Sequence, residues 1–306
     1  KKNVNIFVLH PDNRVSPVQR KLMTTGKDEN VFNIAIKGNF DDCQNLVKSM
    51  FADKKFSNDI KMSGVNSINW ARIIAQSVYY FYSYSLVEDA SEPTNFSVPT
   101  GNFGDVYAGY LAKKMGLPID KLIVATNQND ILHRAISKGS YEAEKVSETI
   151  SPSMDIQIAS NFERLIFDLN NGDDQQTSLD MKNIKEKGQY LINDDKLNKI
   201  SENFLSARMS EDETLEVIKN VYEKFAVVLD PHTAIGYGAF DKHNLKGNNI
   251  VLATAHPCKF PGAIQSAINV KAELPNELTF ILDQKENYDI VENDIEKVKQ
   301  HIKDRT

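Results

Sequence analysis

The stretch Ser97-Val98-Pro99-Thr100-Gly101-Asn102-Phe103-Gly104-Asp105 decides how this chain is interpreted. An apolar run over 95–99 predicts a strand, the Gly-x-x-Gly spacing predicts a turn, and 105–115 follow a helical pattern. Such a sequence predicts a phosphate site, because glycines let the backbone approach an anion and N–H groups of the first helical turn point at it. The alternative is a tight turn without a ligand, since two glycines are a weak signal. A dinucleotide fingerprint fits less well, because the third glycine is missing.

Apolar runs and helical patterns alternate along the chain. Strands are expected at 4–9, 31–36, 95–99, 122–125 and 250–254. Helices are expected at 17–25, 40–51, 69–86, 105–115, 263–270 and from 131 onward. This alternation predicts an α/β fold, with a mostly parallel sheet and helices on both faces. The helix over 69–86 is apolar on all sides and is therefore expected to be buried.

The composition is that of an ordinary globular protein. With 306 residues the chain is long enough for two domains, expected at 1–52 (the remainder of a smaller α/β domain) and 53–306 (a large one). A net charge of −6 argues against nucleic acid or an anionic membrane as partner. The two cysteines, Cys43 and Cys258, cannot form a disulfide framework and suggest a reducing cytoplasm. Neither a membrane span nor a metal site is expected.

A second informative segment is Ala253-Thr254-Ala255-His256-Pro257-Cys258-Lys259-Phe260. Thr254 is expected at the carboxyl end of a strand, where ligands of open α/β sheets bind. Its hydroxyl could donate a hydrogen bond to the nitrogen of a pyridine ring, or it could satisfy a loop backbone. For His256 a structural role is favoured over that of a base.

Two further polar groups have a functional and a structural interpretation. Asn69 and Arg72 share a face of the helix over 69–86, and Arg72 could bind a substrate phosphate or carboxylate. Alternatively, they form a capping arrangement in which Arg72 pairs with a structural carboxylate. His232 follows Asp230-Pro231 at a turn and could move protons, although a satisfied turn histidine is the favoured interpretation.

Seven segments, in order along the chain, resemble the threonine synthase family, whose members use pyridoxal phosphate. They are Ser16-Pro17 with Gln19, Lys37 to Cys43, Asn66 to Asn69 with Arg72 and Gln76, Val98 to Asp105, Ala125-Thr126-Asn127 with Asn129-Asp130, Asp230 to Ala234, and Thr254 to Phe260. The resemblance implies pyridoxal-phosphate fold type II (tryptophan synthase β-like). It implies that Gly101, Asn102, Phe103 and Gly104 hold the cofactor phosphate and that Thr254 faces the pyridine nitrogen.

The chain departs from the family in one respect. Threonine synthases carry the cofactor on a lysine in a Phe-Lys-Asp context, followed by a Ser-Gly-Asp-Thr-Gly loop, and neither motif occurs in this sequence. The lysines Lys37, Lys224 and Lys259 stand in other motifs. We therefore expect a carboxyl-terminal fragment of a longer enzyme, with no catalytic residue of its own and no activity by itself.

For the complete enzyme, the resemblance implies conversion of O-phosphohomoserine and water to L-threonine and phosphate, the last step of threonine biosynthesis. The expected partner is this small substrate, with the protein a monomer or homodimer in the cytoplasm. One alternative is another fold type II lyase, such as a threonine dehydratase. The other is a non-catalytic protein that binds a phosphorylated metabolite.

Overall fold

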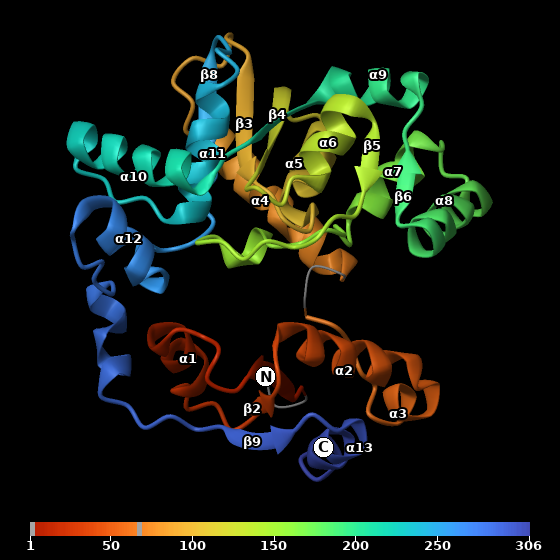
Figure 1. Cartoon of the computed structure of the whole chain (residues 1–306), viewed down its shortest axis with the longest axis vertical. Helices are drawn as coiled ribbons and strands as arrows, with labels where there is room; N and C mark the ends of the chain where they lie inside the picture. Colours follow the sequence, from red (N-terminus) through yellow and green to blue (C-terminus); the bar gives the residue numbers. More distant parts are fainter. Residues whose placement is uncertain (1–3, 66–68) are drawn as a thin grey trace. The chain divides into compact units, whose positions relative to one another are not determined.

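The computed structural model describes residues 4–65 and 69–306, and the chain divides into two compact units. Unit 1 comprises Lys1–Gly64 and Glu273–Thr306, and unit 2 comprises Val65–Ala272 (Figure 1). This division differs from the expected one at 52/53, because the end of the chain returns to the first unit. The reason is a strand pairing between residues far apart in the sequence, between 34–37 and 289–292. Among the described residues, no helix has the length and apolar character needed to cross a membrane.

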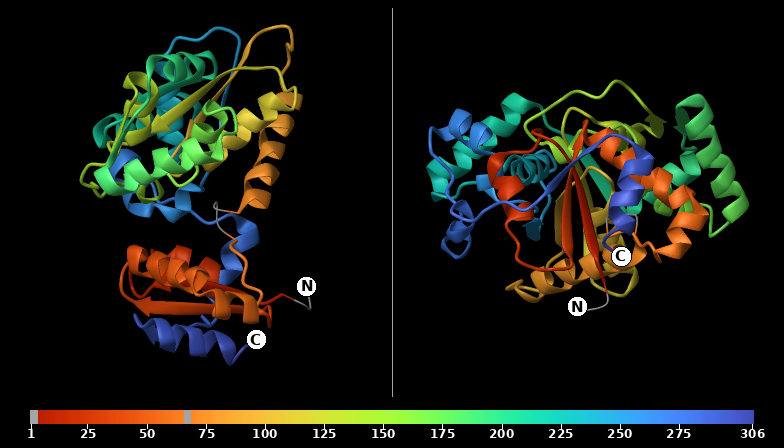
Figure 2. Two further views of the ribbon diagram at one scale, coloured as in Figure 1. Left: turned by 90° about the vertical axis from the view of Figure 1, so that its right-hand side faces the viewer. Right: turned by 90° about the horizontal axis from the view of Figure 1, so that it is seen from below.

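Unit 1 is a small three-stranded parallel sheet with helices. Its elements are β1 (Ile6–Pro11), α1 (Pro17–Thr24), β2 (Val31–Lys37), α2 (Phe40–Ala52), α3 (Lys54–Asp59), the 3₁₀ helix η3 (Asn276–Leu282), β9 (Asp289–Glu292) and α13 (Ile295–Lys303). The strand order is β1-β2-β9, so β2 lies in the centre. The last strand and helix (blue) lie with the first strands (red) in Figure 2. Ile34 and Ile36 of β2 pack with α2, α3 and α13 in one apolar cluster.

Unit 2 is built on a four-stranded parallel sheet of order β7-β4-β3-β8. Its strands are β3 (Thr94–Pro99), β4 (Ile119–Thr126), β7 (Phe204–Arg208) and β8 (Asn248–Val251), and β5 (Ser140–Glu142) pairs antiparallel with β6 (Gln189–Leu191). Its helices are α4 (Trp70–Ser85), α5 (Gly104–Lys114), α6 (Ile131–Lys138), η1 (Pro152–Met154), α7 (Phe162–Leu169), α8 (Asp174–Lys187), α9 (Asp194–Asn203), α10 (Glu211–Phe225), α11 (Pro231–Asp241), η2 (Pro257–Lys259) and α12 (Pro261–Ile268).

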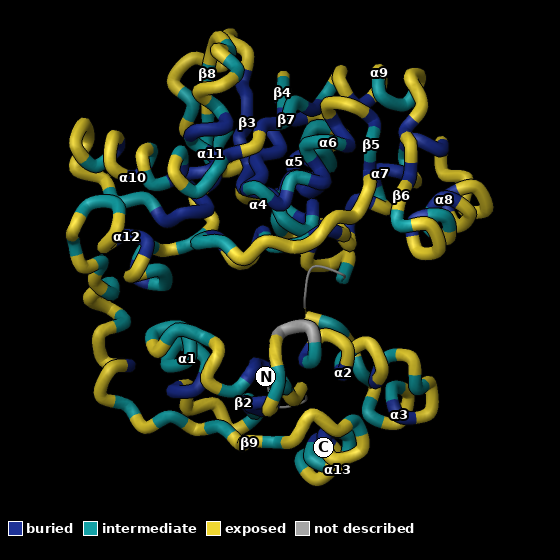
Figure 3. The backbone as a smooth tube through the Cα atoms, viewed as in Figure 1, coloured by how far each residue is buried: buried dark blue, intermediate teal, exposed yellow. Residues whose placement is uncertain are grey.

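Both faces of this sheet are covered, as expected. Side chains alternate along β4: Leu122 and Val124 belong to the core that includes α4, α5 and α6, whereas Ile123 and Ala125 pack with α11 on the other face. The central strands are accordingly buried (Figure 3). The predicted α/β architecture with a parallel sheet is therefore confirmed.

The expectation that the helix over 69–86 is buried on all sides is wrong. Only Ile73, Ser77 and Tyr80 of α4 are buried, and they line the side that packs on α5. Large apolar side chains on its other sides are exposed, namely Trp70, Ile74, Val78, Tyr79, Phe81 and Tyr82. The apolar pattern identified a helix but could not say how many of its sides have neighbours among the described residues.

The last strand of the sheet ends earlier than expected. β8 stops at Val251, and one more ladder bond follows, from Leu252 N to Ser97 O at 3.0 Å. The next position on β3 is Pro99, which has no N–H to continue the ladder. Thr254 therefore lies in the loop beyond the strand.

Candidate functional site

The turn between β3 and α5 leaves the start of the helix without a side-chain cap. Phe103 occupies the N-cap position in the left-handed conformation, with φ 65° and ψ 6°, and its side chain offers no acceptor. A left-handed residue followed by helical residues makes successive N–H groups converge, an arrangement that binds anions. The N-terminus of α5 is therefore suited to binding a phosphate.

The strained conformation of Phe103 is held by packing of its side chain. A left-handed non-glycine residue costs about 1–2 kcal/mol. The Phe103 ring is fully buried, meeting Phe162 edge-on at 5.2 Å and Phe204 at 5.8 Å between ring centroids. The family resemblance places Phe103 among the phosphate-binding residues. The structure limits that contribution to its backbone, because the ring is part of the core.

Gly101 and Asn102 contact a loop that follows in the sequence. A Cβ on Gly101 would lie 2.6 Å from the carbonyl oxygen of Ser153, so glycine is needed here for packing against that loop. The carbonyl of Asn102 accepts from Asn161 N at 3.1 Å, and its side-chain oxygen accepts from Ser160 Oγ at 3.3 Å. The turn is therefore braced by the segment around residues 151–161.

A polar network at the carboxyl edge of the sheet holds this segment. Asn127 and Asn129, directly after β4, donate to Asp155 Oδ1 at 2.8 and 3.0 Å. Thr149 donates to the same carboxylate through its N–H at 2.8 Å and its hydroxyl at 2.7 Å. Asp155 thus accepts four hydrogen bonds and ties the loop to the strand that lies beside β3.

In the sequence, the two asparagines stand out only as part of a family segment, and Asp155 does not stand out at all. Polar residues placed directly after a buried strand were the available signal, because they lie at the edge where ligands bind. Nothing local marks Asp155 among the many acidic residues of the chain.

Asp105, in the first turn of α5, is held by a tyrosine of α4. The Tyr80 hydroxyl donates to the backbone carbonyl of Asp105 at 2.8 Å and to its Oδ1 at 3.2 Å. Burial raises the pKa of the Asp105 carboxyl to about 6, although the hydrogen bond from Tyr80 opposes the shift. The carboxyl beside the proposed phosphate site is thus more easily neutralised than an ordinary aspartate.

The residues of the second segment are placed as follows. Thr254 is exposed, and no described residue makes a hydrogen bond with its hydroxyl, which leaves that group available. His256 is also exposed, and its Nδ1 accepts from Cys258 N at 3.2 Å at the start of η2. This bond is the kind of contact that the structural interpretation of His256 predicts.

Asn69 and Arg72 lie at the start of α4. Asn69 is the N-cap, and its side chain accepts from Ala71 N at 2.9 Å, as the capping interpretation predicts. Arg72 is exposed and donates through Nη1 to the carbonyl of Val65 at 2.8 Å, rather than to the carboxylate expected in that interpretation. Residues 66–68 of the same motif lie outside the described residues.

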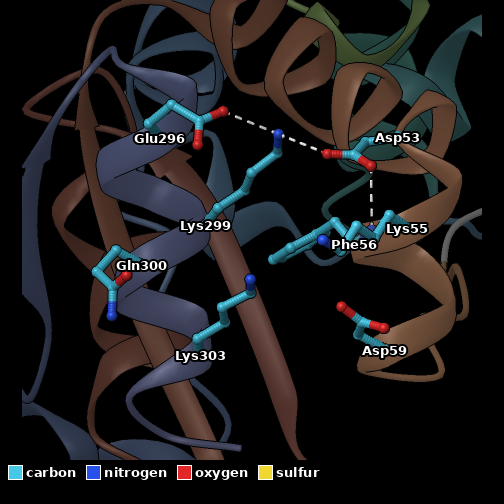
Figure 4. Close-up of a pocket in the computed structure, with 8 residues that line it drawn as sticks. All are labelled: Asp53, Lys55, Phe56, Asp59, Glu296, Lys299, Gln300 and Lys303. Carbon is cyan, nitrogen blue, oxygen red and sulfur yellow. Dashed lines mark hydrogen bonds and ion pairs between the residues drawn. The ribbon is translucent and has the colours of Figure 1, made fainter.

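The pocket in Figure 4 lies in unit 1 between α3 and α13. Lys299 donates there to Asp53 at 2.8 Å and to Glu296 at 2.9 Å, with the Phe56 ring below it at 5.7 Å from Nζ. The three acidic side chains that line the pocket are balanced by three lysines, and no residue singled out from the sequence lines it. The polar groups at the carboxyl edge of the unit 2 sheet are the better candidate site.

Known proteins resemble this chain over nearly its whole length. Residues 233–302 match the family model described as "Threonine synthase, C-terminal". A threonine synthase of Pseudomonas aeruginosa is 45% identical over 98% of this chain. Two solved structures superpose closely: a pyridoxal-phosphate-bound threonine synthase from Brucella melitensis (TM-score 0.94, 45% identity, 99% of this chain) and the yeast enzyme (TM-score 0.91, 42% identity, 100% of this chain).

The chain spans 65% of the length of the Pseudomonas relative, 66% of the Brucella chain and 65% of the yeast chain. Both the sequence identity and the fold extend over nearly all of its own residues. The fold type II architecture implied by the sequence motifs is confirmed, and the chain belongs to the threonine synthase family.

Proposed function

We propose that this chain supplies the cofactor-binding part of a threonine synthase, which converts O-phosphohomoserine and water to L-threonine and phosphate with pyridoxal phosphate. The observation that carries the proposal is the start of α5, where the left-handed Phe103 leads into a helix with no side-chain cap. In a protein of this family, such an anion site has an evident use.

The chain's own residues fit the cofactor. Backbone N–H groups of Gly101, Asn102, Phe103 and Gly104 hold its phosphate. The exposed hydroxyl of Thr254 donates to its pyridine nitrogen. An unprotonated pyridine nitrogen needs a hydrogen-bond donor, which a hydroxyl provides and a carboxylate does not. When bound, the cofactor supplies an electron sink for the charge left when a proton leaves the substrate carbon.

Asn69 and Arg72 are our candidates for holding the substrate. Arg72 uses Nη1 for the Val65 carbonyl, and no described residue accepts a hydrogen bond from its other guanidinium nitrogens. Those groups can bind a phosphate or carboxylate of O-phosphohomoserine. Asn69 orients Arg72 by capping the helix that carries it.

The mutational test compares Gly104→Val with Asp105→Asn in the full-length protein that carries this sequence. We expect the valine to weaken cofactor binding far more, because a branched side chain at the turn blocks close approach of the backbone to the phosphate. The asparagine leaves the N–H donors in place and removes a repulsive charge. Absorbance of the bound cofactor measures both affinities. A larger loss with Asp105→Asn would place the phosphate elsewhere.

We propose that the 306-residue polypeptide by itself is inactive, since the family's Phe-Lys-Asp lysine motif is not among its residues. The assay is phosphate release from O-phosphohomoserine with added pyridoxal phosphate. Turnover within about tenfold of a complete relative, a barrier difference of only ~1.4 kcal/mol, would show that another lysine serves.

The proposed protein works in the cytoplasm as a monomer or homodimer. The two cysteines, Cys43 and Cys258, support a reducing compartment because both are unpaired and buried. Light scattering after size-exclusion chromatography measures the oligomeric state.

A further inference from the structure

The start of α11 carries a buried aspartate–histidine pair with one unused nitrogen. His232 Nδ1 lies 3.0 Å from Asp230 Oδ1, and the same oxygen accepts from His232 N at 2.9 Å. The two residues are 5% and 1% exposed. Nε2 of His232 is buried and has no hydrogen-bond partner among the described residues. The favoured interpretation, a turn histidine whose ring nitrogens both have partners, therefore holds for Nδ1 but not for Nε2.

The pair lies at the carboxyl edge of the unit 2 sheet. A Cβ on Gly236 of α11 would lie 3.1 Å from Pro99 Cγ and 3.0 Å from Val251 Cγ1, at the ends of β3 and β8. The chain after α11 returns to the opposite edge, where Asn248 N donates to Pro93 O at 2.8 Å. The helix thus runs antiparallel to the strands and begins at their carboxyl ends (Figure 1).

His232 lies one helical turn before Gly236, which is about 6 Å along the axis. His232 therefore lies beyond the carboxyl ends of β3 and β8, the side of the sheet on which Gly101 and Thr254 follow those strands. Phe260, from the same segment as Thr254, packs on the ring at 4.8 Å between centroids.

The bond to Asp230 decides what Nε2 can do. Because a carboxylate oxygen only accepts, Nδ1 donates to Asp230, and in the tautomer that has its proton on Nδ1 the Nε2 atom presents a lone pair. A buried acceptor without a donor is unfavourable, and such groups in native proteins usually have a partner. No described residue provides that donor, which leaves a water molecule or a bound ligand.

We propose that His232, oriented by Asp230, is a ligand-contacting residue whose Nε2 accepts a hydrogen bond from a hydroxyl or ammonium group, either of the cofactor whose phosphate binds at α5 or of the substrate bound beside it. This inference rests on the proposed function and assigns a further residue to the same site. The donor belongs either to pyridoxal phosphate or to O-phosphohomoserine, and the experiment separates the two.

The test follows the ¹⁵N resonance of His232 Nε2 in the full-length protein, while ³¹P spectra report ligand binding. Inorganic phosphate, pyridoxal phosphate and O-phosphohomoserine are added in separate samples. We expect Nε2 to move upfield with an organic ligand and to stay in place with inorganic phosphate, and the ligand that moves it identifies the donor. Binding without such a shift, or an equal shift with inorganic phosphate, overturns the role of His232 but leaves the proposed function standing. No binding of any organic ligand overturns both.

A matched pair of variants gives a second measurement. His243 follows the other end of α11, with its Nε2 3.2 Å from the carbonyl oxygen of Ser206. We expect His232→Gln to weaken binding of the organic ligand at least tenfold without changing the affinity for inorganic phosphate, and His243→Gln to change neither. Equal losses in the two variants would contradict the proposal. If His232→Gln does not fold, the NMR measurement on the unaltered protein still decides.

Discussion

Replacing Asp105 with asparagine should stabilise unit 2 at neutral pH. Burial raises the pKa of this carboxyl from 3.8 to about 6, so the folded state binds its proton more tightly than the unfolded state does. The contribution of Asp105 to stability is therefore greatest below pH 4. It falls as the pH rises from about 4 to about 6 and is constant above that range.

The shift sets the size of the effect. About two pKa units at ~1.4 kcal/mol each give an upper bound of ~3 kcal/mol for the cost of ionising Asp105 in the folded state. Asparagine keeps an oxygen that accepts from the Tyr80 hydroxyl but loses the attraction between a carboxylate and the helix N-terminus, which is worth about 0.3–1 kcal/mol. We therefore expect Asp105→Asn to raise the free energy of unfolding by about 2 kcal/mol at pH 7 and to leave it unchanged below pH 4.

Urea denaturation between pH 4 and pH 8 measures this difference. The single tryptophan, Trp70, begins α4, the helix that carries Tyr80, so its fluorescence reports on the relevant unit. As a control, Tyr80→Phe removes the donor to the carboxyl and should move the pH transition of the Asp105 protein upward. The reasoning would be refuted if Asp105→Asn were no more stable than the parent at pH 7. It would also be refuted if the difference in unfolding free energy between the two proteins were equal at pH 4 and pH 7.

Two further pairs of substitutions test the contacts around the site by urea denaturation. A Cβ on Gly109 of α5 would lie 2.4 Å from a ring carbon of Tyr80, so Gly109→Ala should cost about 2 kcal/mol, whereas Gly262→Ala, with nothing within 4 Å, should be nearly neutral. Asp155→Ala removes the acceptor of four hydrogen bonds and should cost about 3 kcal/mol, with Asp155→Asn costing less because one acceptor oxygen remains. A loss of stability in Gly262→Ala as large as that in Gly109→Ala would contradict the packing argument. An Asp155→Ala protein as stable as the parent would contradict the hydrogen-bond argument.

The local features of this protein follow from its sequence. The helices α1 and α4 begin directly after Ser16 and Asn69, as the sequence predicts, because each side chain caps an N–H group only two or three residues away. The strand, turn and helix over 94–114 were likewise predictable, since apolar runs and glycines act on their own neighbourhood. The order of such segments also identified the family.

Only the tertiary structure decided the features that depend on distant residues. The return of β9 to β2 placed the end of the chain in unit 1, and no local pattern encodes that pairing. Pro99 ends the ladder of β8, a strand about 150 residues further along, because a missing N–H matters only to the neighbour it would have reached. Likewise, a tyrosine on another helix sets the environment of Asp105, and the close approach of Gly236 to Pro99 follows from how α11 packs on the sheet. Propensity and capping act within a few residues, whereas burial, pKa and the meeting of side chains depend on contacts that form only when the sheet and its helices pack together.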